Sequence, residues 1–340
     1  MTVPTLDRRP THRVAPLLRS EVSRLTHRRF ARVMALILLG GIVLISLLVF
    51  VTHGRGGTSQ EQLLQNQQEA QQSWVACAQT TPNPDRVQRF CGPEPQSQPL
   101  AAFDYEGDQR YKAYEMLPVG LIGAAIAASG VAFLIGASCG GAEWSSRSMT
   151  LQLLFEPRRL RLLAVKWLSL VLCSAALAAL AMAMTVGLGA VTASMRGTWS
   201  SDFALSDEFR DGLASTLMLM GLRGLVLTAV AATIGYAVAM MVRNTGASLG
   251  VAFVYFVVLE NGARFAFLRM GYAAEPFMLS TNAVAFLFPG GLEVPGGPTS
   301  ALDPAPNIAL TNLRALVTLL GYTVLLVVPA AWSFTRRDVA

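Results

Sequence analysis

Six long apolar runs constrain what this sequence can fold into. They lie at about residues 33–51, 117–139, 164–190, 224–242, 247–268 and 315–334. Each holds roughly 20 residues, the length at which an α-helix crosses a bilayer. Only 14% of the 340 residues are charged, whereas a soluble domain has roughly 25%. We therefore predict an all-α polytopic membrane protein with six transmembrane helices.

The positions of arginine and lysine predict how the spans are oriented. With six spans, the N-terminal arm, the loop between spans two and three, Arg243 and the Arg336-Arg337 tail fall on one side. Basic residues near span ends mark the cytoplasmic side, so both termini are expected there. The arm is long and Arg-rich and precedes an apolar run too long for a signal peptide. Leu18, Val22 and Leu25 share a helical face, which predicts an amphipathic helix over 16–32 at the inner leaflet.

Two domains are expected, a cytoplasmic arm at 1–32 and a six-span transmembrane domain at 33–340. The second domain includes an acidic, Gln- and Pro-rich extracytoplasmic segment at 53–116. It also includes a cytoplasmic loop at 140–163 and an extracytoplasmic region at 269–313. Within that last region, a half-apolar piece near 277–288 is too short to cross and reads as re-entrant or interfacial.

Cysteine usage agrees with this orientation. Cys77 and Cys91 both lie in the segment expected outside, where an oxidising environment allows a disulfide. The alternative is two free thiols. Cys139 and Cys173 lie in or at spans, where cysteine usually packs as a small apolar residue.

The residues for common catalytic chemistry are missing. A phosphate-binding loop, GxxxxGK[ST], needs a glycine before its lysine, and Tyr111 and Val165 precede the two lysines, Lys112 and Lys166. The chain is therefore expected to carry no ATPase. The three histidines are far apart and no metal-ligand pattern occurs, so neither a metal site nor catalytic residues are predicted. The basic residues cluster at span ends, which argues against nucleic-acid binding.

Residues 140–167 contain a short amphipathic stretch framed by basic residues. Met149, Leu153 and Phe155 lie on its apolar side. Held between two spans, such a helix is suited to dock on a partner protein. The alternative is a helix that lies on lipid headgroups.

Two features inside the spans call for an explanation. Span two has a small residue at every fourth position, Gly120, Ala124, Ala128, Ala132, Gly136 and Gly140, a pattern that allows close helix packing. Packing within the chain is favoured over a subunit interface. In span five, Glu260 and Arg264 are spaced to pair along the helix. They mark either a translocation path or a structural ion pair.

The layout resembles the membrane subunits of bacterial type-2 ABC exporters, the ABC-2 permease family. The local matches are Glu21 in LLRSEVSRL, the stretch from Glu143 to Lys166 around Pro157-Arg158-Arg159, Glu260 in VVLEN, and the ending FTRRD. The resemblance covers nearly the whole chain. It departs at Ser148-Met149, where many members have Gly-Thr, and in the long segment after span one.

The resemblance implies a bacterial inner-membrane permease that moves a substrate outward. It would pair with a second permease subunit, as a homo- or heterodimer, and with a dimer of cytosolic ABC ATPase subunits. ATP and Mg would be bound by the ATPase, with no cofactor in this chain. The implied ATPase-coupling residues are Glu143, Trp144, Arg147, Met149, Leu153, Phe155, Arg158 and Arg159. The implied residues of the translocation path are Phe133, Tyr255, Phe256, Glu260 and Arg264.

Two other functions remain open at this stage. One is a membrane anchor or signalling component that transports nothing. The other is an ion-coupled secondary transporter, for which inverted repeats and interrupted helices in both halves would be expected. A neighbouring gene for a P-loop ATPase would distinguish the exporter from both.

Overall fold

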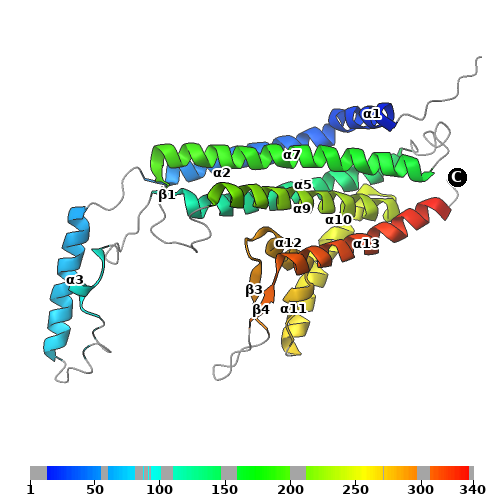
Figure 1. Cartoon of the computed structure of the whole chain (residues 1–340). Helices are drawn as coiled ribbons and strands as arrows, with labels where there is room; N and C mark the ends of the chain where they lie inside the picture. Colours follow the sequence, from blue (N-terminus) through cyan, green and yellow to red (C-terminus); the bar gives the residue numbers. More distant parts are fainter. Residues whose placement is uncertain are drawn as a thin grey trace, which may run out of the picture. The chain divides into compact units, whose positions relative to one another are not determined.

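Helices dominate the computed structural model, which describes residues 14–54, 60–80, 87, 91, 93–100, 110–146, 159–199, 212–270, 272–296 and 307–336. Within these residues, six helices are long and apolar enough to cross a membrane, as predicted (Figure 1). They are α2 (Arg29–Thr52), α5 (Ala113–Ser145), α7 (Arg159–Arg196), α9 (Leu213–Val242), the fifth span Thr245–Phe267, and α13 (Asn312–Arg336).

The fourth of these helices is longer than its apolar core. Its apolar run begins at about residue 224, directly after Arg223, but α9 begins at Leu213. The Arg223 guanidinium donates to the backbone oxygen of Phe288 at 3.2 Å, so this charge is held inside the helix by a protein acceptor. Met220, in the added turns, is buried. One side of the added turns therefore packs against the protein, whereas Met218 and Leu222 are 80% and 60% exposed.

The fifth span consists of three segments: α10 (Thr245–Phe253), the π-helix η3 (Val254–Leu259) and α11 (Glu260–Arg269). Arg243, in the left-handed region at φ 59°, ends α9. The Asn244 side chain then accepts from the backbone N–H of Ala247 at 3.1 Å and caps α10. In the π-helix the Glu260 N–H donates to Tyr255 O, five residues back, instead of four.

The contacts divide the chain into two compact units. Unit 1 comprises Met1–Val43, Pro118–Val186 and Ser206–Ala340, and unit 2 comprises Leu44–Leu117 and Gly187–Leu205. This division differs from the expected boundary between residues 32 and 33, since the N-terminal arm belongs to unit 1.

In unit 1, the small residues of α5 lie against α9 (Figure 1). A Cβ on Gly136 would collide with the backbone oxygen of Ala232, and one on Gly140 would lie 2.8 Å from Ala239 Cβ. From the α9 side, a Cβ on Gly235 would collide with the backbone oxygen of Phe133. The small-residue stripe therefore serves packing within the chain, as favoured.

The region between α11 and α13 adds a short helical layer and a hairpin. It contains η4 (Glu275–Phe277), α12 (Leu279–Leu287) and the antiparallel strands β3 (Leu292–Val294) and β4 (Ile308–Leu310). Asn312, at the start of α13, donates to the carbonyl oxygens of Ala285 and Phe288 at 2.9 and 2.7 Å. The C-terminal end of α12 is thereby fixed to α13. A short helix thus lies where the half-apolar piece was noted.

Unit 2 contains α3 (Gln60–Thr80), the turn η1 (Pro95–Ser97), and the paired strands β1 (Tyr111–Lys112) and β2 (Gly197–Thr198). A disulfide joins Cys77 of α3 to Cys91, with Cα atoms 5.9 Å apart, in agreement with the prediction. Gln67 Nε2 donates to Pro95 O at 3.2 Å, which adds a second link between α3 and the chain that follows it.

Candidate functional site

Four charged side chains meet in unit 1, and we call them the charge cluster: Glu21, Arg28, Glu143 and Lys166. The Lys166 ammonium lies 3.0 Å from Glu143 Oε1 and 3.3 Å from Glu21 Oε1. The Arg28 Nη2 donates to Glu143 Oε1 at 2.9 Å. Two carboxylates thus face two cations, and the formal charge of the cluster is zero.

Each member of the cluster comes from a different part of the chain. Glu21 lies on α1 (Val14–His27), and Arg28 is the break residue between α1 and α2. Glu143 lies in the last turn of α5, and Lys166 in the second turn of α7. The cluster therefore fixes the N-terminal helix to the two helix ends that flank residues 147–158.

The cluster is largely removed from water. The side chains of Lys166 and Glu143 are 3% and 5% exposed, and that of Glu21 is 14% exposed. Apolar residues around these helix ends form one core, including Leu25, Leu162 and Phe334. A buried charge that loses its partner is strongly destabilising, so these four groups hold their elements in one arrangement.

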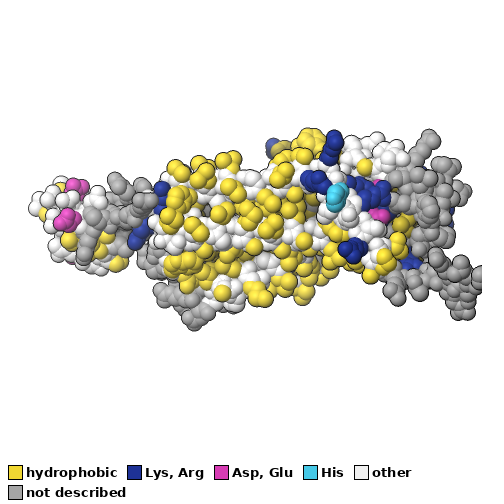
Figure 2. All heavy atoms as spheres, turned by 90° about the horizontal axis from the view of Figure 1, so that it is seen from above, with side chains coloured by type: hydrophobic (Ala, Val, Ile, Leu, Met, Phe, Trp, Pro, Cys, Tyr) yellow, Lys and Arg dark blue, Asp and Glu magenta, His cyan; other side chains and the backbone are white. Residues whose placement is uncertain are grey.

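The helix α1 is amphipathic, but it spans Val14–His27 instead of the predicted 16–32, because the chain breaks at Arg28 before α2 begins. Leu25 is buried, Leu18 and Val22 are half-buried, and Arg19 is exposed on the other face. Figure 2 shows Lys and Arg side chains gathered over this helix and the start of α2, beside the hydrophobic surface of the spans.

A second group of contacts lies next to the cluster and centres on Trp144. The Arg243 guanidinium stacks 4.1 Å from the Trp144 ring centroid, and the indole N–H donates to Met240 Sδ at 3.3 Å. Phe334 meets the same indole edge-on. Arg159 Nη1 donates to Thr335 O at 3.2 Å, so the ends of α5, α9 and α13 and the start of α7 converge.

The contacts of Glu143 lie within the chain, and its coupling role stays a prediction. It was expected to contact a partner protein, but it lies inside the chain with Arg28 and Lys166 as partners. Trp144 and Arg159 are at the same end of unit 1 and are partly accessible. The other predicted coupling residues lie outside the described residues: Arg147, Met149, Leu153, Phe155 and Arg158.

The predicted pair in the fifth span has different partners from those expected. Arg264 does not pair with Glu260; its Nε lies 3.1 Å from Glu275 Oε1. Glu260 is buried and accepts the backbone N–H of Ser280, at the start of α12, at 2.9 Å. Both residues therefore attach α11 to the α12 region. Glu260 does so at the first turn of α12, where the N-terminus of a helix favours a carboxylate, and Arg264 does so through Glu275.

Of the remaining path candidates, Tyr255 lies one π-turn before Glu260, whose N–H donates to its backbone oxygen. Tyr255 contacts the ring of Phe256 edge-on, and it also contacts Tyr322 of α13. Phe133 lies on α5, where its backbone oxygen faces Gly235. Phe256 is 41% exposed, so this part of the fifth span offers an apolar surface to its surroundings.

Sequence reasoning missed two ion-pair partners. These are Arg28, which pairs with Glu143, and Glu275, which pairs with Arg264. A signal for the first was present. Glu143 and Lys166 each stand in largely apolar surroundings at a helix end, where an ionised side chain needs a partner. No comparable signal points to Glu275.

A family model described as a protein of unknown function, DUF2705, matches residues 99–340, more than two thirds of the chain. The chain belongs to this family. No curated protein matches the sequence at a significant level.

The DUF2705 match includes two members of the charge cluster and excludes the other two. Glu143 and Lys166 fall within residues 99–340, whereas Glu21 and Arg28 precede them. The cluster therefore joins the part of the chain that defines DUF2705 to the N-terminal helix before it.

Proposed function

We propose that this chain is the permease subunit of an ATP-driven ABC exporter in a bacterial inner membrane. Two such subunits would work with two copies of a separate cytosolic ATPase that binds ATP and Mg. Six apolar helices, an amphipathic N-terminal helix and a short helix between spans five and six support this proposal.

One observation carries the proposal, the buried charge cluster. It fixes α1, α5 and α7 to one another at the two ends that flank residues 147–158. A partner that moves this segment would displace all three helices as one body, since the alternative is to separate buried opposite charges. If the ends of α5 and α7 were not fixed to each other, the segment between them would absorb the same motion without moving the helices.

The basic residues support the cytoplasmic placement of this end. Arg19, Arg29 and Arg32 are exposed near the cluster, and Arg243 and Arg336 lie at the same end of unit 1. Arginine in short segments beside spans favours the cytoplasmic side. An ATPase docked there would meet the predicted coupling residues.

The test uses the tagged full chain, purified from its native membrane in mild detergent. We expect a P-loop ATPase to co-purify, and the complex to hydrolyse ATP. The double variant Leu153→Ala, Phe155→Ala should weaken that association or uncouple hydrolysis from transport. The matched control is Phe265→Ala, Leu313→Ala, two residues that are 61% and 71% exposed away from the cluster.

Three outcomes would contradict the proposal. Failure to recover an ATPase would remove the exporter function altogether. An ATPase that binds without any ATP-dependent transport would favour a signalling or anchoring component. Retention of the partner and of coupled transport by the Leu153/Phe155 variant would show that this segment is not the coupling element.

A further inference from the structure

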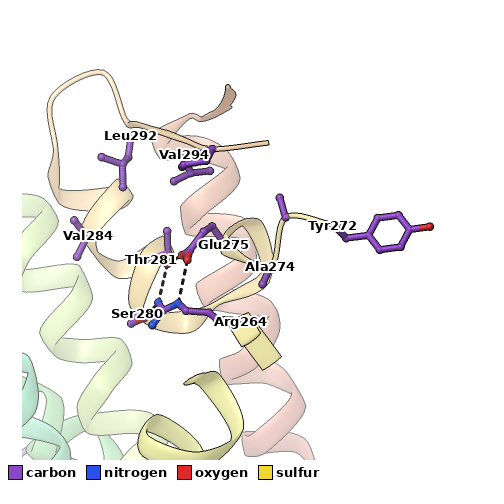
Figure 3. Close-up of a pocket in the computed structure, with 11 residues that line it drawn as sticks. Arg264, Tyr272, Ala274, Glu275, Ser280, Thr281, Val284, Leu292 and Val294 are labelled. Carbon is purple, nitrogen blue, oxygen red and sulfur yellow. Dashed lines mark hydrogen bonds and ion pairs between the residues drawn. The ribbon is translucent and has the colours of Figure 1, made fainter. Parts of the chain in front are cut away.

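A pocket of about 470 Å³ opens where α11, η4, α12 and β3 meet (Figure 3). Its volume is within the range of roughly 300–1,000 Å³ that small-molecule sites occupy. It lies within unit 1, at the far end of α11 from the charge cluster. Its lining residues divide into a polar group and an apolar group.

The polar group centres on an ion pair. Arg264 Nε lies 3.1 Å from Glu275 Oε1, and Arg264 Nη2 donates to Ser280 Oγ and Thr281 Oγ1 at 2.8 and 3.2 Å. Thr281 in turn donates to Glu275. The two charged side chains are 34% and 30% exposed, so both ions present a face to the pocket.

The pair still has hydrogen-bonding capacity. Arg264 Nη1 has no hydrogen-bond partner among the described residues, and a guanidinium carries five N–H donors. A carboxylate can accept about four hydrogen bonds, and two to Glu275 are present. A ligand can therefore add one acceptor at Arg264 and one donor at Glu275 without breaking the pair.

The apolar group faces this pair across the pocket. Figure 3 shows Leu292 and Val294 of β3 above the ion pair and Val284 of α12 to one side. Pro295 also lines the pocket, and Ala274 lies beside Glu275 on the side of the ion pair. A molecule that fills the pocket thus needs an ionic head and an apolar body.

The pocket lies towards the C-terminal end of the fifth span. Arg264 is 19 residues beyond Thr245, where that span begins, which is about 28 Å of α-helix. The hydrocarbon core of a bilayer is about 30 Å thick. If the span begins at one edge of that core and crosses it, the ion pair would lie near the headgroups on the opposite side.

We propose that this pocket binds the headgroup of a zwitterionic phospholipid with a primary ammonium, of the phosphatidylethanolamine type. The phosphate accepts from Arg264 Nη1, the ammonium donates to Glu275, and the start of an acyl chain lies against Val284, Leu292 and Val294. A head with no net charge matches a pair with no net charge. The proposal concerns a membrane lipid and does not depend on an ATPase partner.

The lining also selects against two other headgroups. A purely anionic head would place its charge beside Glu275 as well as Arg264, and like charges repel. A choline head carries a quaternary ammonium, which proteins usually hold in aromatic cages. The aromatic residue of this lining, Tyr272, points away from the pocket in Figure 3 and is 65% exposed.

The test is a binding titration on the purified full chain in dodecylmaltoside, followed by native mass spectrometry. The probes are dihexanoyl phosphatidylethanolamine and dihexanoyl phosphatidylglycerol. We expect the ethanolamine lipid to bind about tenfold more tightly, and Glu275→Gln to remove that preference, since it deletes the charge-assisted hydrogen bond to the ammonium. Arg264→Gln should weaken the binding of both lipids, since it deletes the contact to the phosphate that they share. The matched control is Arg269→Gln on the same helix, whose guanidinium stacks on Phe265; it should bind as the wild type does.

Equal binding of the two lipids, an unchanged preference in Glu275→Gln, or unchanged affinities for both lipids in Arg264→Gln would overturn the proposal. Because Glu275→Gln could disturb the local fold, Val284→Phe provides a second variant that fills the apolar wall and leaves the ion pair intact. It should weaken binding about tenfold while the thermal midpoint stays unchanged. Soluble phosphoethanolamine should bind far more weakly than the lipid. If it binds equally well, the apolar wall contributes nothing and a lipid is the wrong ligand.

Discussion

Replacement of Lys166 by methionine tests the charge cluster directly. Methionine keeps most of the length of the side chain and removes the ammonium that lies between two carboxylates. Glu143 then keeps Arg28 as a partner, whereas Glu21 loses its close contact with Lys166 and keeps Arg24 at 3.8 Å. The variant thus leaves the largely buried Glu21 with a more distant and more exposed counter-ion, Arg24.

The expected loss of stability follows from the distances. At an effective dielectric constant of about 20, each of the two ammonium–carboxylate contacts, at 3.0 and 3.3 Å, contributes about 5 kcal/mol of Coulomb attraction. Removal from water costs several kcal/mol per ion and offsets roughly half of this attraction. The net destabilisation from loss of one partner is therefore about 3–5 kcal/mol.

A double-mutant cycle of Lys166→Met and Glu143→Gln separates pairing from other effects. We expect the double variant to lose about 2 kcal/mol less free energy of unfolding than the two single variants lose together, because each single variant leaves the other charge uncompensated. The assay is reversible unfolding in mixed micelles, followed by tryptophan fluorescence. Lys112→Met is the control, since Lys112 has no ion-pair partner in the described part of the chain; its effect should be within about 0.5 kcal/mol.

A coupling energy below about 0.5 kcal/mol would refute the reasoning. It would mean that the contacts do not hold the helices together, although they are close. The proposed rigid displacement of α1, α5 and α7 would then lose its physical basis.

Three further outcomes are expected. Gly136→Ala should cost about 1–3 kcal/mol because its Cβ meets α9, whereas Gly123→Ala, with nothing within 4 Å, should be neutral or up to about 1 kcal/mol more stable in unfolding assays. Reporter fusions should place Ala340 in the cytoplasm and an insertion at Ser97 outside; the same side for both would exclude six spans. Glu260→Leu should lower the free energy of unfolding by about 1–3 kcal/mol by leaving the partly buried N–H of Ser280 unpaired. Glu260→Gln keeps an acceptor, so an equal loss would argue against this capping role.

The spans could be predicted because their signal is local. A run of about 20 apolar residues is a property of the adjacent sequence, and all six runs correspond to helices. The start of α9 was missed for the same reason: Arg223 looks like a boundary until its acceptor, the oxygen of Phe288, is known. That acceptor is 65 residues away in the chain.

The partners in both charged groups could not be predicted, because they depend on how distant segments pack. Arg28 and Glu143 are 115 residues apart, and the sequence around each residue does not indicate which residue is its partner. For Arg264 the sequence offered Glu260 at helical spacing, but that carboxylate turns to the N-terminus of α12. The pair that formed, with Glu275, requires the chain to turn back after α11.

The π-helix in the fifth span has a consequence for which sequence changes the span can accept. A π-turn holds one residue more than the α-turn it replaces, and each residue turns a helix by about 100°. Deletion of one residue between 254 and 259 would turn the π-turn into a regular α-turn and leave the residues beyond it facing the same way. Deletion of one residue in α10, with the π-turn kept, would instead rotate everything beyond it by about 100°. Glu260 would then no longer face the first turn of α12, and Arg264 would leave Glu275. The fifth span should therefore tolerate the loss of a residue at its π-helix better than the loss of one in α10.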